Sequence, residues 1–183
     1  MQIVLPHSKP TLSVLICHLP ERAEKLQRLL GQLYLQVNDH AVEIIVNEGD
    51  GTTGYKRNEL IKAAKGKYIV SFDDDDEPSY NYFDKIFKYL DGKNAAVGFV
   101  IEFRFGKHII PMICTSAVTT PISFPDCIFK PITHIQPILK ELCVEFPDIT
   151  KDEDVVWWKK MAEVLKGKRC AFILETLYFY NQH

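Results

Sequence analysis

The chain has 183 residues, of which 46% are hydrophobic and 25% are charged, and its formal net charge at pH 7 is −2. These values fit one globular domain with a full hydrophobic core, and they argue against a basic surface that binds nucleic acid. The longest apolar runs are the size of strands, so we expect neither a transmembrane segment nor a secretory signal at the start of the chain.

The first half of the chain alternates short apolar runs with amphipathic segments. One leucine-rich stripe at helical spacing consists of Leu26, Leu29, Leu30, Leu33 and Val37. This order predicts an α/β fold with a mostly parallel central sheet flanked by helices on both faces. The predicted elements are strands at 12–16, 42–46 and 67–72, and helices at 20–36, 55–65 and 78–90.

The second half is less regular. Two apolar stretches at 95–103 and 108–113 predict a small antiparallel hairpin, because a glycine-containing turn joins them. We also predict helices near 134–146 and 154–165 and a last strand at 169–174. No repeat or linker divides the chain, so we expect a single domain over residues 1–183.

The five cysteines are scattered and odd in number, and none forms a Cys-x-x-Cys pair. Each lies among apolar neighbours, which is typical of small buried side chains in a reducing compartment. The sequence therefore predicts a cytoplasmic protein with structural cysteines at Cys17, Cys114, Cys127, Cys143 and Cys170.

Four consecutive aspartates, Asp73 to Asp76, follow the third predicted strand. Ligands of open parallel sheets bind beyond the carboxyl ends of the strands, where this run is expected. Alternation along an extended chain would point Asp73 and Asp75 to one side and Asp74 and Asp76 to the other. One pair could then hold a hard divalent cation, which would relieve the repulsion within the run. The alternative is a solvated acidic turn before the next helix.

Two further segments carry candidate chemistry. Lys56 and Arg57 lie at the predicted start of a helix after a glycine-rich turn, where backbone amides and basic side chains favour phosphate; a basic first turn is also a common surface feature. Glu153 and Asp154 open the helix at 154–165. They either stabilise the helix dipole or include a base that takes a proton from a hydroxyl.

The histidines allow the same two interpretations. His18 follows the first predicted strand, His134 begins a predicted helix, and His183 ends the sequence. Each could be a site residue, and each could be an ordinary surface or partly buried side chain.

These segments together resemble family 2 glycosyltransferases of the GT-A fold, in particular the short, single-domain type of phage and bacterial surface-glycan gene sets. The resemblance runs from about Leu12 to Tyr180 and depends on the order of the segments at 12–22, 42–50, 54–68, 72–78 and 133–154. It implies an inverting enzyme that moves a sugar from a nucleoside-diphosphate sugar, of the UDP or GDP type, to a hydroxyl of a glycan or other surface polysaccharide precursor. Residues 1–92 would bind the donor and residues 93–183 the acceptor.

The resemblance also implies site residues. The catalytic base would be Asp154, with Glu153 beside it, and the metal, Mn²⁺ or Mg²⁺, would bind Asp75 with Asp76 in support. The nucleotide-sugar would contact His18, Pro20, Arg22, Glu48, Asp50, Lys56, Arg57, Asn58, Asp73 and Asp74.

Two positions depart from the family pattern. Asn47-Glu48-Gly49-Asp50 stands where the family has an aspartate pair that contacts the base, and Asp152 stands where it has a glycine. The chain is also short for this family, so a second copy or a partner protein could complete the acceptor site.

Two other functions fit the same architecture. A sugar-phosphate nucleotidyltransferase would show a glycine-rich basic loop after its first strand, and residues 17–22 contain none. A non-catalytic module that binds nucleotide or metal would not need Glu153 and Asp154 beside an intact aspartate motif.

Overall fold

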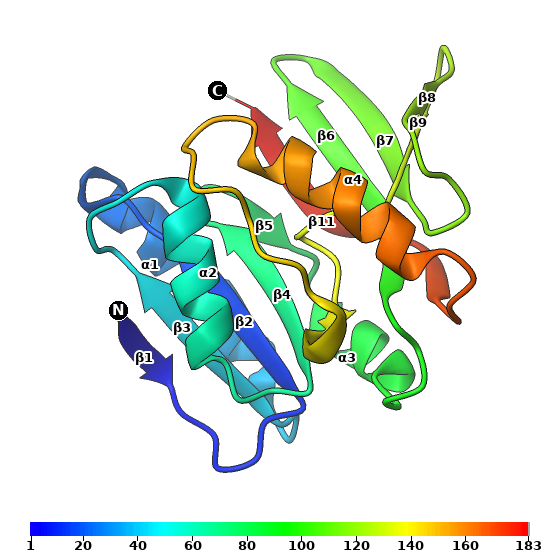
Figure 1. Ribbon diagram of the computed structural model, residues 1–183. Coiled ribbons are helices and arrows are strands. Elements are labelled where there is room, and N and C mark those ends of the chain that lie inside the picture. The colour runs from blue at the N-terminus through cyan, green and yellow to red at the C-terminus, as the bar shows by residue number, and fades with distance from the viewer. Residues whose placement is uncertain (183) are drawn as a thin grey trace.

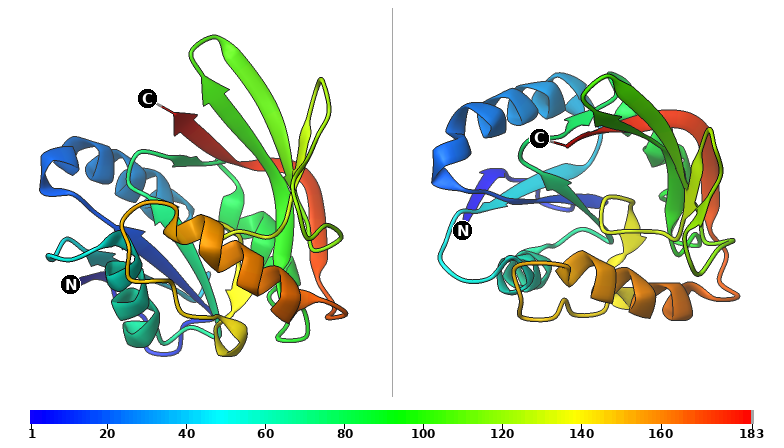
Figure 2. Two further views of the ribbon diagram at one scale, coloured as in Figure 1. Left: turned by 45° about the horizontal axis from the view of Figure 1, so that its top comes forward. Right: turned by 90° about the horizontal axis from the view of Figure 1, so that it is seen from above.

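The computed structural model describes residues 1–182, so His183, which the sequence raised as a candidate site residue, lies outside the described residues. The chain folds into two β-sheets with helices packed against them (Figures 1 and 2). Among residues 1–182, no helix combines the length and the apolar character that crossing a membrane requires.

The first sheet has five strands in the order β1-β3-β2-β4-β10. Its central strands β3, β2 and β4 are parallel and almost entirely buried, as expected where both faces are covered. This confirms the three predicted strands. The outer strands β1 and β10 are antiparallel to their neighbours and too short for a periodic pattern to reveal them. The bounds are β1 (Gln2–Leu5), β2 (Leu12–Cys17), β3 (Val42–Asn47), β4 (Tyr68–Asp73) and β10 (Ile138–Leu139).

Helices α1 and α2 cover opposite faces of this sheet (Figure 2). The 3-10 turn η1 (Pro20–Arg22) leads into α1 (Ala23–Val37), whose predicted leucine stripe packs against the core. On the other face, α2 (Thr53–Ala63) starts earlier than predicted. Its start is fixed because the hydroxyl of Thr52 accepts a hydrogen bond from the backbone amide of Tyr55 at 3.1 Å and so caps the helix.

The helix predicted at 78–90 is shorter than expected. β5 (Glu77–Pro78) pairs with β11 (Ala171–Gln182), so helical backbone begins only at α3 (Tyr82–Ile86) and continues in η2 (Phe87–Tyr89). The apolar face was predicted correctly, since the four side chains expected to point inward are all buried: Tyr82, Phe83, Ile86 and Leu90.

The second sheet has six strands in the order β5-β11-β6-β7-β9-β8 and is mixed. β6 (Val97–Phe105) and β7 (His108–Cys114) form the predicted hairpin. The hairpin belongs to this larger sheet, because β11 pairs with β6 in parallel far beyond the predicted end of the last strand at residue 174. At the other edge lie β8 (Ile122–Ser123) and β9 (Ile128–Lys130).

The helix predicted near 134–146 is wrong. β10 pairs with β4 there, and the only helical turn within the predicted range is η3 (Lys140–Leu142). Pro137 explains the error, because proline lacks the amide donor that a helix needs and disfavours helical backbone in the residue before it. The chain turns instead, with the side-chain oxygen of Gln136 accepting a hydrogen bond from the Thr133 amide at 2.7 Å.

The last predicted helix is confirmed as α4 (Glu153–Leu165), which lies on the same side of the first sheet as α2 (Figure 2). Trp157 stacks on Phe146 with the ring centroids 4.9 Å apart, and its indole nitrogen donates to the Val144 carbonyl at 2.8 Å. These contacts fix the segment that leads into α4.

Candidate active site

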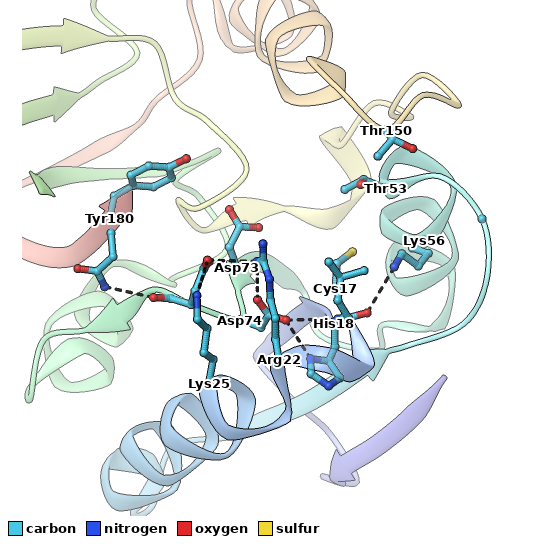
Figure 3. A pocket seen from close by; sticks show the side chains of 14 residues that line it. Cys17, His18, Arg22, Lys25, Thr53, Lys56, Asp73, Asp74, Thr150 and Tyr180 are labelled. Carbon is cyan, nitrogen blue, oxygen red and sulfur yellow. Dashed lines mark hydrogen bonds and ion pairs between the residues drawn. The ribbon is translucent and has the colours of Figure 1, made fainter. Parts of the chain in front are cut away.

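An open cavity of about 510 Å³ lies beyond the carboxyl ends of β2 and β4 (Figure 3). Its walls come from the ends of those strands, the starts of α1 and α2, and the end of β11. This is the position expected for a ligand of an open α/β sheet. The volume falls within the roughly 300–1,000 Å³ of typical small-molecule sites.

The acidic run forms a turn at this cavity. The backbone amide of Asp76 donates to the Asp73 carbonyl at 3.2 Å, so the chain is not extended here. The predicted alternation is therefore wrong, because the neighbouring Asp74 and Asp75 share one partner: Nη1 of Arg22 lies 3.1 Å from a carboxylate oxygen of each.

Asp73 is joined to α4 through Arg57. Nη2 of Arg57 donates to Asp73 at 2.9 Å, and its Nε donates to Glu153 at 3.3 Å. Burial alone would raise the pKa of Asp73. The positive charge of Arg57 and the contact with His134 both oppose this, and the pKa of Asp73 lies below its ordinary value. Arg57 thus lies behind the cavity wall and links two candidate site segments.

Asp74 fixes the loop after β2. It is 2% exposed, and one of its oxygens lies 2.9 Å from Nδ1 of His18 and accepts the Leu19 amide at 3.3 Å. Its other oxygen pairs with Arg22. This carboxylate therefore positions the predicted donor loop, of which His18, Leu19 and Arg22 line the cavity while Pro20 is exposed.

Asp75 faces a row of cations on the first helical segment. Its carboxylate lies 3.1 Å from Arg22 and 3.5 Å from Lys25, and its carbonyl accepts from Arg28 at 3.3 Å. The positive charge that balances the run comes from the protein itself. The sequence signal for this contact is the spacing of the three cations, which occur at every third residue.

Asp76 is turned away from the cavity. It is 1% exposed, and its two oxygens accept hydrogen bonds from the Tyr178 hydroxyl and the Asn181 amide, both at 2.8 Å. Burial, followed by the negative charge of Asp73, raises its pKa to about 8. This geometry suits the support of the loop better than direct contact with a metal.

Lys56 reaches the cavity from the first turn of α2, and its Nζ donates to the His18 carbonyl at 3.4 Å. The helix start lies against the segment before α4, because the Gly54 amide donates to the Ile149 carbonyl at 3.0 Å. A Cβ atom at Gly54 would lie 1.8 Å from the Pro147 carbonyl oxygen, so only glycine permits this approach. This close approach of α2 to the segment before α4 brings Thr150 into the cavity wall.

The remaining candidates for donor binding lie at or behind the rim. Glu48 and Asp50 are exposed on the loop after β3, in which Gly51 lines the cavity. Asn58 lies deeper in α2, where its side chain donates to the Phe146 carbonyl at 2.9 Å and accepts the Phe146 amide at 2.8 Å.

Replacement of Asn58 by alanine is expected to lower the free energy of unfolding by about 1–3 kcal/mol, because it leaves both backbone groups of Phe146 without their partner. Affinity for a nucleoside diphosphate should stay unchanged. Urea denaturation and calorimetric titration with UDP and GDP measure the two effects. A tenfold loss of nucleotide affinity without loss of stability would instead support the prediction that Asn58 contacts the donor.

A second cavity of about 160 Å³ lies between α4 and the second sheet. Asp154 lines it, and Tyr180 lines both cavities. Burial, together with the nearby carboxylates led by Asp73, raises the pKa of Tyr180 to about 12, so its hydroxyl stays neutral and can donate a hydrogen bond. His134 also lines the second cavity, and its Nε2 lies 3.8 Å from Asp73.

The contribution of β11 to the cavity was not predicted from the sequence. Tyr180 and Asn181 line the first cavity, yet the last strand was predicted to end at residue 174. The aromatic and β-branched residues at 176–180 were the available signal, since they favour a strand.

Solved glycosyltransferase structures share this fold. S. aureus TarS 1–349 matches with a TM-score of 0.68 and 14% identity over 93% of this chain and 60% of that chain. Its complex with UDP-GlcNAc matches with a TM-score of 0.68 and 13% identity over 94% of this chain and 59% of that chain. A third match is the mannosyltransferase PcManGT from Pyrobaculum calidifontis in complex with GDP-Man and Mn²⁺. Its TM-score is 0.57, with 14% identity over 98% of this chain and 60% of that chain. This chain thus spans about 60% of the length of TarS 1–349 and of PcManGT, and 37% of the longer TarS chain.

The sequence comparison agrees with the fold. A search among curated proteins gave no match. The family model described as glycosyl transferase family 2 matches residues 19–113, more than half of the chain, from the loop after β2 through most of β7. The predicted α/β fold class is therefore confirmed, although the two sheets contain more antiparallel pairing than the mostly parallel sheet that was expected. The chain belongs to glycosyl transferase family 2 with the GT-A fold.

Proposed function

We propose that this glycosyltransferase moves a sugar from a nucleoside-diphosphate sugar, of the UDP or GDP type, to a hydroxyl of a glycan acceptor, with inversion at the anomeric carbon. The observation that carries the proposal is the pair of cavities that share Tyr180, one lined by cations and aspartates and the other by Asp154. UDP-GlcNAc and GDP-Man are bound in structures with the same fold, which supports this class of donor.

The donor is proposed to lie in the larger cavity. Lys56 at the start of α2, with Arg22 and Lys25 opposite, would pair with the diphosphate. The loop that Asp74 holds would border the nucleotide base. Tyr180 and Asn181 also line this cavity, so we propose a single domain in which the second half mainly binds the acceptor and completes the donor site.

The donor set at the acidic turn fits a hard divalent cation. Asp73, Asp74 and Asp75 line the cavity, and carboxylate oxygens are preferred by Mg²⁺ and Mn²⁺. No group of three or more His, Cys, Asp or Glu side chains with metal-binding geometry occurs within residues 1–182. An ion at this turn would therefore be bound by one or two carboxylates together with substrate phosphates.

Asp75 is the proposed ligand, with Asp76 supporting the loop. A bound Mg²⁺ or Mn²⁺ would supply positive charge for the departing diphosphate. Arg22 and Lys25 pair with Asp75 and are 40% and 36% exposed, so these side chains have room to move from the carboxylate to phosphate.

Asp154 is the proposed base. Its carboxylate would take the proton of the acceptor hydroxyl while that oxygen forms a bond to the anomeric carbon and the bond from this carbon to the diphosphate oxygen breaks. Glu153 would position the start of α4, because it is held to Asp73 through Arg57.

Incubation with a panel of UDP- and GDP-sugars and Mn²⁺ tests the proposal. Slow release of nucleoside diphosphate supports a glycosyltransferase acting on water in place of its acceptor. A second incubation contains a sugar phosphate and a nucleoside triphosphate. Release of pyrophosphate in that incubation would instead indicate a nucleotidyltransferase. Binding of nucleotide without any reaction, in the presence of diverse acceptors, would favour a non-catalytic module.

Replacement of Asp75 by asparagine is expected to weaken Mn²⁺ binding in the presence of UDP or GDP by at least about tenfold, because the amide offers a neutral oxygen in place of a charged one. Electron paramagnetic resonance of free Mn²⁺ measures the affinity. Asp39→Asn, at an exposed position after α1, is the matched control and should leave it unchanged. Unaltered binding in Asp75→Asn would remove this residue from the metal site.

A further inference from the structure

Half of the residues that line the smaller cavity are apolar. β6 and β7 contribute Ile101, Phe103, Met112 and Cys114, and Ile135 adds a further apolar side chain. Its volume of about 160 Å³ is below the roughly 300–1,000 Å³ of sites for drug-sized ligands. It therefore suits a fragment such as one sugar ring or a short polyol.

Two side chains of opposite formal charge line these walls. Asp154 comes from α4 and Lys130 from β9, where Lys130 is paired in register with Cys114. Among residues 1–182, neither the Lys130 amine nor the Asp154 carboxylate takes part in a hydrogen bond or an ion pair with another side chain. Both charged groups are thus available to a ligand.

The charge of Lys130 reaches the cavity interior. Burial raises the pKa of the Cys114 thiol to about 12, and the positive charge of Lys130 opposes this rise. Lys130 itself is half-buried. A ligand that fills the cavity would remove more water from the amine, which is costly unless the ligand supplies a negative charge.

Asp154 limits where that negative charge can lie. If it accepts the proton of the attacking hydroxyl, the acceptor hydroxyl points toward α4. An anionic group on the acceptor would be repelled by Asp154 and attracted by Lys130, so it would point toward β9. The two residues together would set the orientation of the acceptor.

We propose that the smaller cavity binds an acceptor that carries an anionic group, a phosphate or a carboxylate, beside its hydroxyl, and that Lys130 recognises this group. The inference rests on the proposed function, because it takes the acceptor to lie next to Asp154. It adds the chemical class of the acceptor: an acidic sugar or a phosphorylated sugar or polyol, in preference to a neutral sugar.

Binding of glucose, glucuronate and glucose 6-phosphate, followed by calorimetry and ligand-observed NMR, tests this inference. The carboxylate and phosphate probes distinguish the two kinds of anion. We expect at least one anionic sugar to bind about tenfold more tightly than glucose, the difference that one charge-assisted hydrogen bond typically makes. Lys130→Ala should abolish the preference and Lys130→Arg should keep it, whereas Lys107→Ala, at the exposed β6–β7 turn, should have no effect.

Equal affinities for all three sugars, including no detectable binding of either anion, would overturn the inference, and so would a preference that persists in Lys130→Ala. The result is distinguishable from failure of the proposed function. Hydrolysis of nucleotide-sugars needs no acceptor, so its absence counts against the transferase whatever Lys130 binds. Hydrolysis with no anion preference counts against the acceptor class alone.

Discussion

Replacement of Asp154 by asparagine is expected to slow sugar transfer by about a hundred- to ten-thousandfold, the contribution of a general base in other enzymes. Asparagine keeps the shape of the side chain but cannot take the proton of the acceptor hydroxyl. Asp154 accepts no hydrogen bond from the other residues within 1–182, so the change should disturb the fold little. Initial rates with a nucleotide-sugar and an accepted glycan measure the loss, and titration with UDP or GDP should give an unchanged affinity.

Two further variants on α4 separate catalysis from structure. Glu163→Gln removes a charge at an exposed position of the same helix and should leave both rate and stability unchanged. Glu153→Gln should lower stability, because this buried carboxylate pairs with Arg57. If Asp154→Asn retains full activity, another group takes the proton and Asp154 has only a structural effect on its helix.

The sequence predicted the parts of the fold that carry a strong local pattern. β2, β3 and β4 are continuous apolar runs because helices cover both faces of their sheet, and α1 shows a leucine stripe because only one face is buried. The β6–β7 hairpin was predictable from two apolar stretches around Gly106, which adopts a φ of +57° in the turn.

The errors arose where long-range pairing overrides local preference. Residues 134–146 contain apolar side chains at helical spacing, but Pro137 and the edge of the first sheet convert Ile138 and Leu139 into β10. The extension of β11 could not be predicted locally, since its partner β6 lies about 75 residues earlier in the sequence.

The candidate site follows the same division. The order of the motifs predicted which segments meet, but not which side chains pair within them. Asp152 shows that the family pattern also carries information about the backbone. It adopts a φ of +62° at the position where the family has glycine, and glycine adopts this conformation without strain. Arg57 illustrates the side-chain pairing that was not predicted, because it pairs with Asp73 of the aspartate run and also with Glu153, which lies 96 residues later in the sequence.

Replacement of Arg57 by alanine is the change with the largest expected effect on stability, a loss of about 3–5 kcal/mol in the free energy of unfolding. Arg57 is 4% exposed and joins Asp73 on β4 to Glu153 on α4. Without the guanidinium, the buried Glu153 loses its only ion-pair partner among residues 1–182, and Asp73 retains only the more distant His134. Urea denaturation measures the loss, and Lys62→Ala, an exposed cation on the same helix, should change stability by less than about 0.5 kcal/mol.

The lysine variant shows whether charge or geometry matters at this position. Lysine keeps the positive charge, but its single amine lacks the planar fork with which Arg57 contacts two carboxylates through different nitrogens. Arg57→Lys should therefore recover only part of the stability lost in Arg57→Ala. It should also transfer sugar more slowly than the parent chain at equal folded fraction, because the start of α4, which carries Asp154, is no longer tied to the aspartate turn. Full activity in a folded Arg57→Lys variant would contradict this coupling, since the bridge would then serve stability alone.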